Sequence, residues 1–157
     1  MADRDELALR RVQTQIVLDL QRLRNATERR IGELLVVQEL TPITPAQANA
    51  LMVLVNAREP LTGADLARAL GLSEVTVGRF VKALVDGDWV ARQKDPEDGR
   101  RLLLRPTGKT REALPRFVAV SNGMLDEVFA GWSAGDVEDL GVRMAQLRGR
   151  LELGAES

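Results

Sequence analysis

The segment from Ala67 to Val77 constrains the fold of this chain more than any other. A small residue, Ala67, is followed four positions later by Gly71, and the branched apolar Val77 comes six positions after the glycine. A small side chain lets two short helices cross closely, and glycine readily adopts the left-handed conformation that a three-residue turn often needs. Val77 would then pack the second helix onto the first. The spacing predicts a helix-turn-helix, and an ordinary helical hairpin with a glycine turn is the alternative.

The second of these helices carries polar and basic side chains at helical spacing. They are Ser73, Thr76, Arg79 and Lys82. Such a helix fits the major groove of duplex DNA, where arginine bonds guanine and hydroxyl groups bond base edges or phosphates. A helix face that is merely solvated has the same composition. The pattern alone therefore leaves both interpretations open.

A short β-hairpin is predicted directly after the two helices. Residues 89–93 and 102–105 are typical of short strands, and the segment between them, 94–99, is rich in turn-forming residues. Arg100 and Arg101 follow the turn, and an arginine on such a loop can enter the minor groove of DNA. Small helical bundles rarely contain a basic hairpin at this place, so the insertion is the first indication of function.

Two aspartates, Asp95 and Asp98, lie on the predicted turn, although a DNA-facing loop should avoid acidic groups. We expect their side chains to close the turn and to orient Arg100 through a hydrogen-bonded ion pair. A turn that is simply soluble, with balanced charge, is the alternative.

The net charge of −1 does not by itself indicate any class of binding partner, but the charge is unevenly distributed along the chain. Residues 92–116 contain eight basic and four acidic residues, whereas residues 121–157 contain three basic and seven acidic ones. Phosphate binding depends on the local patch rather than on the total. Arg92 and Lys94 belong to the basic part, and we include them among the candidate DNA contacts. The acidic C-terminal part should be held away from DNA.

Amphipathic helices are predicted on both sides of this unit. Apolar residues recur at spacings near three and four over residues 5–38, which indicates one long helix. Thr44 and Pro45 are typical of the start of another helix, which should end near residue 57.

Two further helices are expected after the hairpin. Thr107 is typical of a cap for a helix to about residue 130, and Pro115 should begin a turn or kink there rather than lie deep inside it. The buried stripe of that helix would be Leu114, Val118, Leu125, Phe129 and Trp132. A last helix carries an apolar seam suited to packing on a partner helix, formed by Val137, Leu140, Met144, Leu147 and Leu151.

The composition excludes several classes of function. The chain has no cysteine and no histidine, which excludes disulfides, thiol chemistry, and thiolate or imidazole metal sites. Only 3% of the residues are aromatic, so a stacking surface for single-stranded nucleic acid is not expected. No nucleophile–base pair or phosphate loop is visible, so we expect neither an enzyme nor a cofactor. No signal core or membrane-spanning run is apparent, and a soluble cytoplasmic protein is expected.

Residues 61–107 resemble the winged helix-turn-helix of the MarR family of bacterial transcriptional regulators. The resemblance is strongest in the predicted hairpin, which corresponds to the wing of the family. The pattern there is Asp98, one intervening residue and Arg100, followed six and seven positions later by Pro106 and Thr107. Two residues depart from the family pattern, because Pro106 stands where leucine is usual and Asp88 where glycine is usual. Other matching stretches are Leu66-Ala67-Arg68-Ala69-Leu70-Gly71-Leu72-Ser73, Thr76-Val77-Gly78-Arg79-Phe80-Val81-Lys82-Ala83-Leu84 and Trp89-Val90-Ala91-Arg92.

The resemblance implies a mainly α-helical fold with a small β-hairpin wing and with N- and C-terminal dimerisation helices. A single domain would span residues 5–153, with dimerisation helices over 5–40 and 108–153 and a DNA-binding lobe over 44–107. The homodimer would bind a pseudo-palindromic operator, with Arg100 in the minor groove and half-sites about one helical turn apart.

The resemblance also implies a regulator, most often a repressor, that a small aromatic or phenolic effector releases from DNA. The effector would occupy a cleft between the first, second and fifth helices, where Met52 and Trp132 are possible wall residues, although both are more typical of core. An alternative is a winged-helix module that binds protein instead of DNA. Its recognition helix would show an apolar face, and Thr76, Arg79 and Lys82 argue against that.

Overall fold

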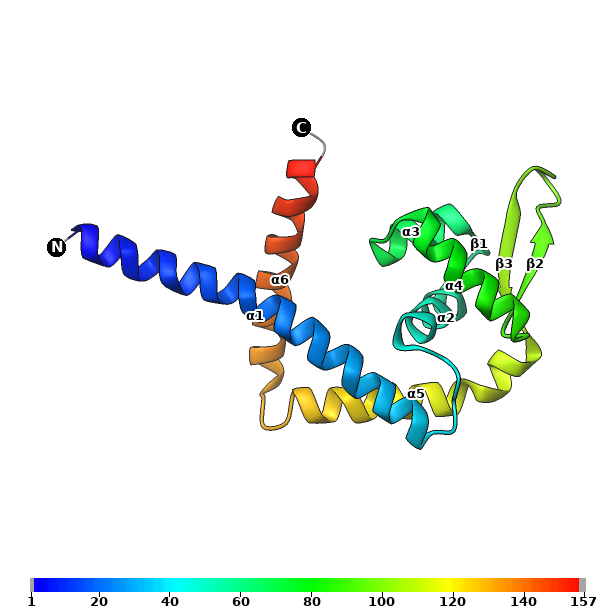
Figure 1. Ribbon diagram of the computed structural model, residues 1–157, viewed down its shortest axis with the longest axis horizontal. Helices are drawn as coiled ribbons and strands as arrows, with labels where there is room; N and C mark the ends of the chain where they lie inside the picture. Colours follow the sequence, from blue (N-terminus) through cyan, green and yellow to red (C-terminus); the bar gives the residue numbers. More distant parts are fainter. Residues whose placement is uncertain (1, 156–157) are drawn as a thin grey trace.

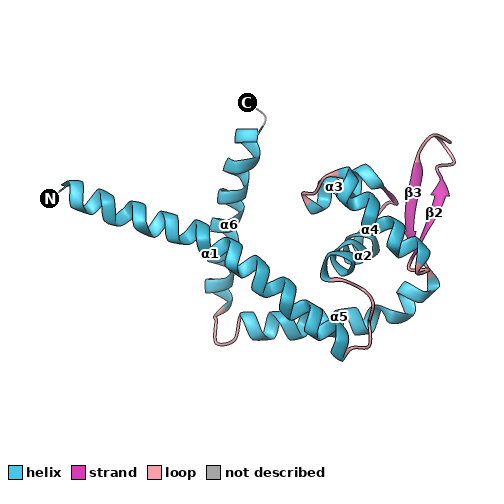
Figure 2. Cartoon of the chain, viewed as in Figure 1, coloured by secondary structure: helices cyan, strands magenta, loops and turns pink. Residues whose placement is uncertain are grey.

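The computed structural model describes residues 2–155 of the chain, and the side chains of residues 5–152. Helices dominate, with short strands near the middle of the sequence (Figure 2). The elements follow in the order α1 (Ala2–Val37), α2 (Pro45–Asn56), β1 (Leu61–Thr62), α3 (Gly63–Leu70), α4 (Glu74–Asp86), β2 (Val90–Lys94), β3 (Leu102–Pro106), α5 (Gly108–Val128) and α6 (Ala134–Ala155). The expected fold class, mainly α with a winged helix-turn-helix, is confirmed.

The chain is arranged as a rounded lobe with an extended helical arm (Figure 1). The lobe holds α2, α3, α4 and the sheet, while α1 and α6 extend away from it and α5 joins the two parts. The core lies in the lobe and between α5 and the C-terminal half of α1, around buried residues such as Leu35, Leu51 and Leu66. The arm has much less buried apolar surface than the lobe.

The helix starts follow from the capping residues. Thr44 and Thr62 both form capping boxes, in which the threonine hydroxyl accepts a hydrogen bond from a backbone N–H three residues later. Ser73 and Thr107 cap α4 and α5 in the same way. Gly71 ends α3 with φ of 64°, the left-handed conformation that the sequence predicted for the turn.

The wing is the hairpin of β2 and β3, which with β1 forms a three-stranded antiparallel sheet in the order β1-β3-β2. The expected strands pair in register, with Val90 opposite Pro106 and Lys94 opposite Leu102. The third strand, β1, was not expected, because a strand of two residues is too short to show an alternating pattern in the sequence. Its Leu61 pairs with Leu104 of β3. Pro106 stands at the end of its strand, where its missing N–H costs little.

The base of the wing is fastened to α5. The Thr110 hydroxyl is fully buried and donates to the carbonyl oxygen of Trp89 over 2.5 Å. The Trp89 ring packs edge-to-face on Phe117, with 5.8 Å between ring centroids. The Thr107 hydroxyl donates to the carbonyl of Asp88, whose φ is 58°. These contacts tie the wing to the helix that leaves the lobe.

Two expectations about α5 are wrong. Pro115 lies well inside a continuous helix, because it is exposed and water can satisfy the Arg111 carbonyl that loses its intrahelical partner. The face buried within the chain is not the predicted stripe, since Val118, Leu125 and Trp132 are each more than 40% exposed. The buried residues of α5 are instead Thr110, Ala113, Phe117 and Val120. The helix thus has two apolar faces, and only one is covered here.

The predicted seam of α6 lies uncovered, as a partner-binding seam should in a single chain. Its five residues are between 36% and 76% exposed. The first half of α1 is similar, with Leu9, Val12 and Ile16 exposed. Among the described residues, no helix is long and apolar enough to cross a membrane.

Candidate nucleic-acid interface

Helix α4 packs on the lobe through Val77, Val81 and Leu84, which are all buried. These three residues are separated by four and three positions, so they form one stripe along the helix. The residues on the opposite side of α4 are exposed. A helix held in this way presents its outer face to whatever binds the lobe.

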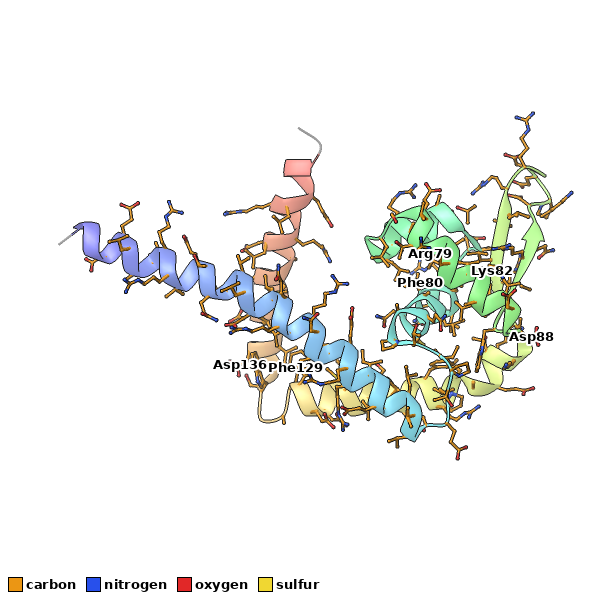
Figure 3. All side chains as sticks on the ribbon, in the orientation of Figure 1. Arg79, Phe80, Lys82, Asp88, Phe129 and Asp136 are labelled. Atoms are coloured by element: carbon orange, nitrogen blue, oxygen red, sulfur yellow. The ribbon has the colours of Figure 1, made fainter. Side chains whose placement is uncertain are left out.

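The four predicted contacts on α4 do not share one face. Each residue turns an α-helix by about 100°, so a step of three falls about 60° short of a full turn and successive members drift around the helix. Arg79 and Lys82, which Figure 3 labels on α4, are exposed, and the helical spacing places them on the side opposite the buried stripe. Thr76 is half-buried.

Ser73 and Thr76 have a local structural task. The Ser73 hydroxyl accepts from the backbone N–H of Thr76 and lies 2.9 Å from the Thr76 hydroxyl. Lys82 is paired with Asp86, with 2.6 Å between the ammonium nitrogen and the carboxylate. Because this pair is exposed, it can exchange for a pair with phosphate at little cost. Arg79 and Lys82 are therefore the better-placed of the four.

Sequence reasoning missed Val75, which is 69% exposed in the first turn of α4. It stands four residues before Arg79 and seven before Lys82, the spacing of a single helical face. The signal was available, because a residue two positions before the buried Val77 must point to the opposite side.

The wing tip is organised by its aspartates, but not as expected. Asp95 accepts from the backbone N–H of Glu97, and Asp98 accepts from that of Arg100, so the prediction that they close the turn is confirmed. The expected ion pair to Arg100 is wrong. Asp95 pairs instead with Arg101, at 3.5 Å between nitrogen and oxygen.

A second carboxylate explains why Arg101 is preferred. Asp65, in the first turn of α3, lies 4.0 Å from the Arg101 guanidinium, so two acids compete for this arginine. Hydrogen bonds from the Thr62 hydroxyl and backbone lower the pKa of Asp65, which keeps it charged. Arg100 is exposed at the tip. Arg101 holds the wing against α3, and Arg100 is left to reach outward.

A hollow of about 620 Å³ separates α4 from the wing. Glu74 and Gly78 of α4 line one side, while Arg92 of β2 and Arg100 and Arg101 of the wing line the other. Lys94, at the end of β2, is exposed. The fold therefore brings α4 next to the wing, with Arg92, Arg100 and Arg101 lining the hollow between them. The predicted residues of α4 do not line this hollow.

A second cavity, of about 380 Å³, lies between α1, α2 and α5. These are the three helices from which the effector cleft was expected. Apolar side chains dominate its wall, among them Ile31, Met52 and Phe117, with Asn49 and Asn56 supplying polar groups. Trp132 does not line it; it is 47% exposed and packs edge-to-face on Phe129.

The described residues contain no group of three or more acidic side chains that could hold a metal ion. The surface around α4 and the wing carries charged groups that can bind an anion. Its chemistry consists of guanidinium and ammonium groups on a convex helix and an adjacent loop.

A family model, the MarR family, matches residues 41–101. Among curated proteins, the uncharacterized HTH-type transcriptional regulator YcgE of Bacillus subtilis is 32% identical over 74 residues. That match covers 46% of this chain and 48% of YcgE, so the chain spans about half the length of this relative.

Solved structures share the fold over most of the chain. A MarR transcriptional regulator from Methanosarcina mazei Go1 superimposes with a TM-score of 0.75 and 21% identity, covering 89% of this chain and 99% of that one. CouR from Rhodococcus jostii RHA1, solved with p-coumaroyl-CoA bound, gives 0.74 and 19%, covering 84% and 90%. The lobe of this chain thus matches the model of the MarR family of transcriptional regulators, and the chain as a whole shares the fold of solved MarR regulators.

Proposed function

We propose that this chain acts as a sequence-specific, double-stranded-DNA-binding transcriptional regulator. The observation that carries the proposal is that α4 and the wing border one hollow, with Arg92 and Arg100 in its lining. Arg79 and Lys82 are exposed on the side of α4 opposite its buried stripe. A helix of this kind enters the major groove, and an arginine on a wing enters the adjacent minor groove. In this proposal Ser73 and Thr76 contact the sugar-phosphate backbone of DNA at the start of α4. Lys94 and Arg101 add positive charge that attracts the DNA phosphates.

The proposed active form is a homodimer on a pseudo-palindromic operator. Residues 5–40 and 108–153 would pair with those of a second copy, leaving the lobe of residues 44–107 to bind one half-site each. The uncovered seam of α6 and the uncovered apolar residues of α1 support this division. Such a regulator would act in the cytoplasm, where bacterial and archaeal DNA lies.

We further propose that the regulator is a repressor released by a small aromatic or phenolic effector in the cavity between α1, α2 and α5. The apolar wall and the polar Asn49 and Asn56 suit a flat ring that carries hydrogen-bonding groups. The CouR structure, which holds p-coumaroyl-CoA, gives a precedent in a protein of the same fold. An effector seated there would contact both the arm and α2 of the lobe.

The test is a mobility-shift assay on an operator selected from random duplexes. Arg100→Ala should weaken binding by about 5- to 150-fold, since one arginine contact with a groove is worth about 1–3 kcal/mol. Arg58→Ala is the charge-matched control, because Arg58 lies in the loop after α2 and lines a different hollow. Equal affinities of wild type and Arg100→Ala would contradict the wing contact. Added phenolic acids should release the wild-type complex if the effector proposal holds.

A further inference from the structure

Val75 is an exposed apolar residue of the lobe whose identity as valine does not contribute to the stability of the fold. Its side chain is 69% exposed, more than that of Leu72 (37%) or Leu102 (48%), the other exposed large apolar residues of residues 44–107. A β-branched residue is also a weaker helix former than alanine. Neither packing within the chain nor helix propensity therefore favours valine at this position.

The position of Val75 on α4 places it with the basic residues. Taking about 100° per residue, Val75, Arg79 and Lys82 lie within about 60° of one another and opposite the buried Val77. Val75 is the N-terminal member of this outward stripe, two residues after the Ser73 cap. In helix-turn-helix proteins, the N-terminal residues of the second helix contact base edges.

The surroundings of Val75 indicate the chemistry of its partner. Arg79 and Lys82 follow it on the same face. The hollow beside α4 is lined by three arginines, among them Arg92 and Arg100, and by one acidic residue, Glu74, so its charge is positive on balance. A partner that meets this surface must be anionic overall and must still offer an apolar spot to a valine. Duplex DNA has this combination, because the 5-methyl group of thymine projects into the major groove between two phosphate backbones.

We propose that Val75 is a specificity residue that reads a thymine by contact with its 5-methyl group. The inference rests on the proposed DNA binding and adds a base preference to it: each half-site contains a thymine opposite the start of α4. Arg79 and Lys82 then contact bases or phosphates further along the groove.

The test replaces single thymines of the selected operator by deoxyuridine, which removes only the methyl group. At one or two positions in each half-site, the substitution should weaken wild-type binding by about fourfold, the value of one buried methyl group. In Val75→Ala the same substitutions should change affinity by less than about twofold. Val37→Ala is the matched control, since Val37 is 70% exposed but ends α1; it should keep the wild-type penalty.

The outcomes separate the inference from the function. An operator whose deoxyuridine penalties are the same in wild type and Val75→Ala overturns the reading by Val75 while leaving DNA binding intact. A protein that selects no duplex, but binds another protein through the same face in a Val75-dependent way, overturns both. If the loss of affinity caused by deoxyuridine disappears in Val75→Ala but not in Val37→Ala, the inference is supported. Combining a change in the DNA with a change in the protein isolates the contact between the two groups.

Discussion

At the scale of single residues, the turn between α3 and α4 depends on Gly71. Its φ of 64° is left-handed, and a Cβ there would meet open space, so any cost of substitution arises from the backbone alone. An L-residue in this conformation costs about 1–2 kcal/mol. The sequence identified this glycine because the spacing of the surrounding apolar residues left only one place for the turn.

Gly71→Ala should lower the melting temperature by several degrees, at about 2–4 °C per kcal/mol for a chain of this size. Gly78→Ala is the counterpart, because Gly78 lies inside α4 with open space around its Cα. Alanine should stabilise that helix by about 0.5–1 kcal/mol. Thermal unfolding followed by circular dichroism compares the two variants, and a loss of stability in both would contradict the argument from backbone conformation.

The wing shows what single residues could not reveal in the sequence. The pattern located Asp95, Asp98 and Arg100 correctly on one turn, and it identified the hydrogen bonds that close it. It could not show that Asp65, thirty residues away, adds a second carboxylate beside Arg101. The partner of an arginine depends on which side chains folding brings together. Val75 was missed because a pattern of polar and basic residues along a helix does not include an apolar residue on the same face.

At the scale of elements, an ion pair between Arg30 and Glu127 adds to the apolar packing between α1 and α5. Arg30 of α1 donates two hydrogen bonds to the Glu127 carboxylate of α5, one of them 2.8 Å from Nε, and a further one to Glu33. The hydrogen bonds from Arg30 lower the pKa of Glu127, and they raise that of Arg30 further above its usual value. The two pKa shifts are opposite in sign, and each favours the charged form of its group, as expected for an ion pair.

The lowered pKa predicts how stability depends on pH. A carboxylate whose pKa is depressed by folding stabilises the protein above its unfolded-state pKa, near 4.3, and this contribution disappears as pH falls through the folded value. Glu127→Gln should therefore melt below wild type at pH 7, and the difference should vanish at low pH. Melting curves between pH 7 and 3 measure it. Glu28→Gln, which breaks a local pair with Arg24, is the control and should have little effect.

Element boundaries were largely predictable, because capping residues mark them. Thr44 and Thr107 begin their helices where expected, and Thr62 and Ser73 cap α3 and α4 through the same kind of hydrogen bond. The faces of α5 were not predictable in the same way. A helix that packs on its own chain with one face and leaves a second apolar face open has two overlapping stripes, and the sequence does not say which is covered first.

At the scale of the whole molecule, the distribution of apolar surface argues for a second copy. The arm exposes apolar side chains along α1, α5 and α6, including Leu23, Leu125 and Leu147. An exposed apolar surface that extends over three helices marks an association surface. The lobe by comparison has a well-formed core and few exposed apolar residues, so the two parts of the chain differ in what they require from a partner.

Met144→Glu should convert the protein into a monomer and abolish operator binding, because it places an unpaired charge in the seam of α6. Gln146→Glu adds the same charge on the opposite side of α6 and should leave the protein dimeric. Sedimentation velocity measures both. If Met144→Glu sediments as wild type does, the seam is not the site of pairing.

If a dimer of this chain binds duplex DNA through its basic side chains, the binding must depend steeply on salt concentration. Fluorescence anisotropy with the selected operator, repeated from about 50 to 200 mM salt, should show two chains per duplex and an affinity that falls steeply, with a slope near −0.9 for each phosphate contacted. Arg100→Ala should bind more weakly at every salt concentration. An affinity that does not change with salt, or protein that remains unbound to every duplex in dilute buffer, would contradict the account.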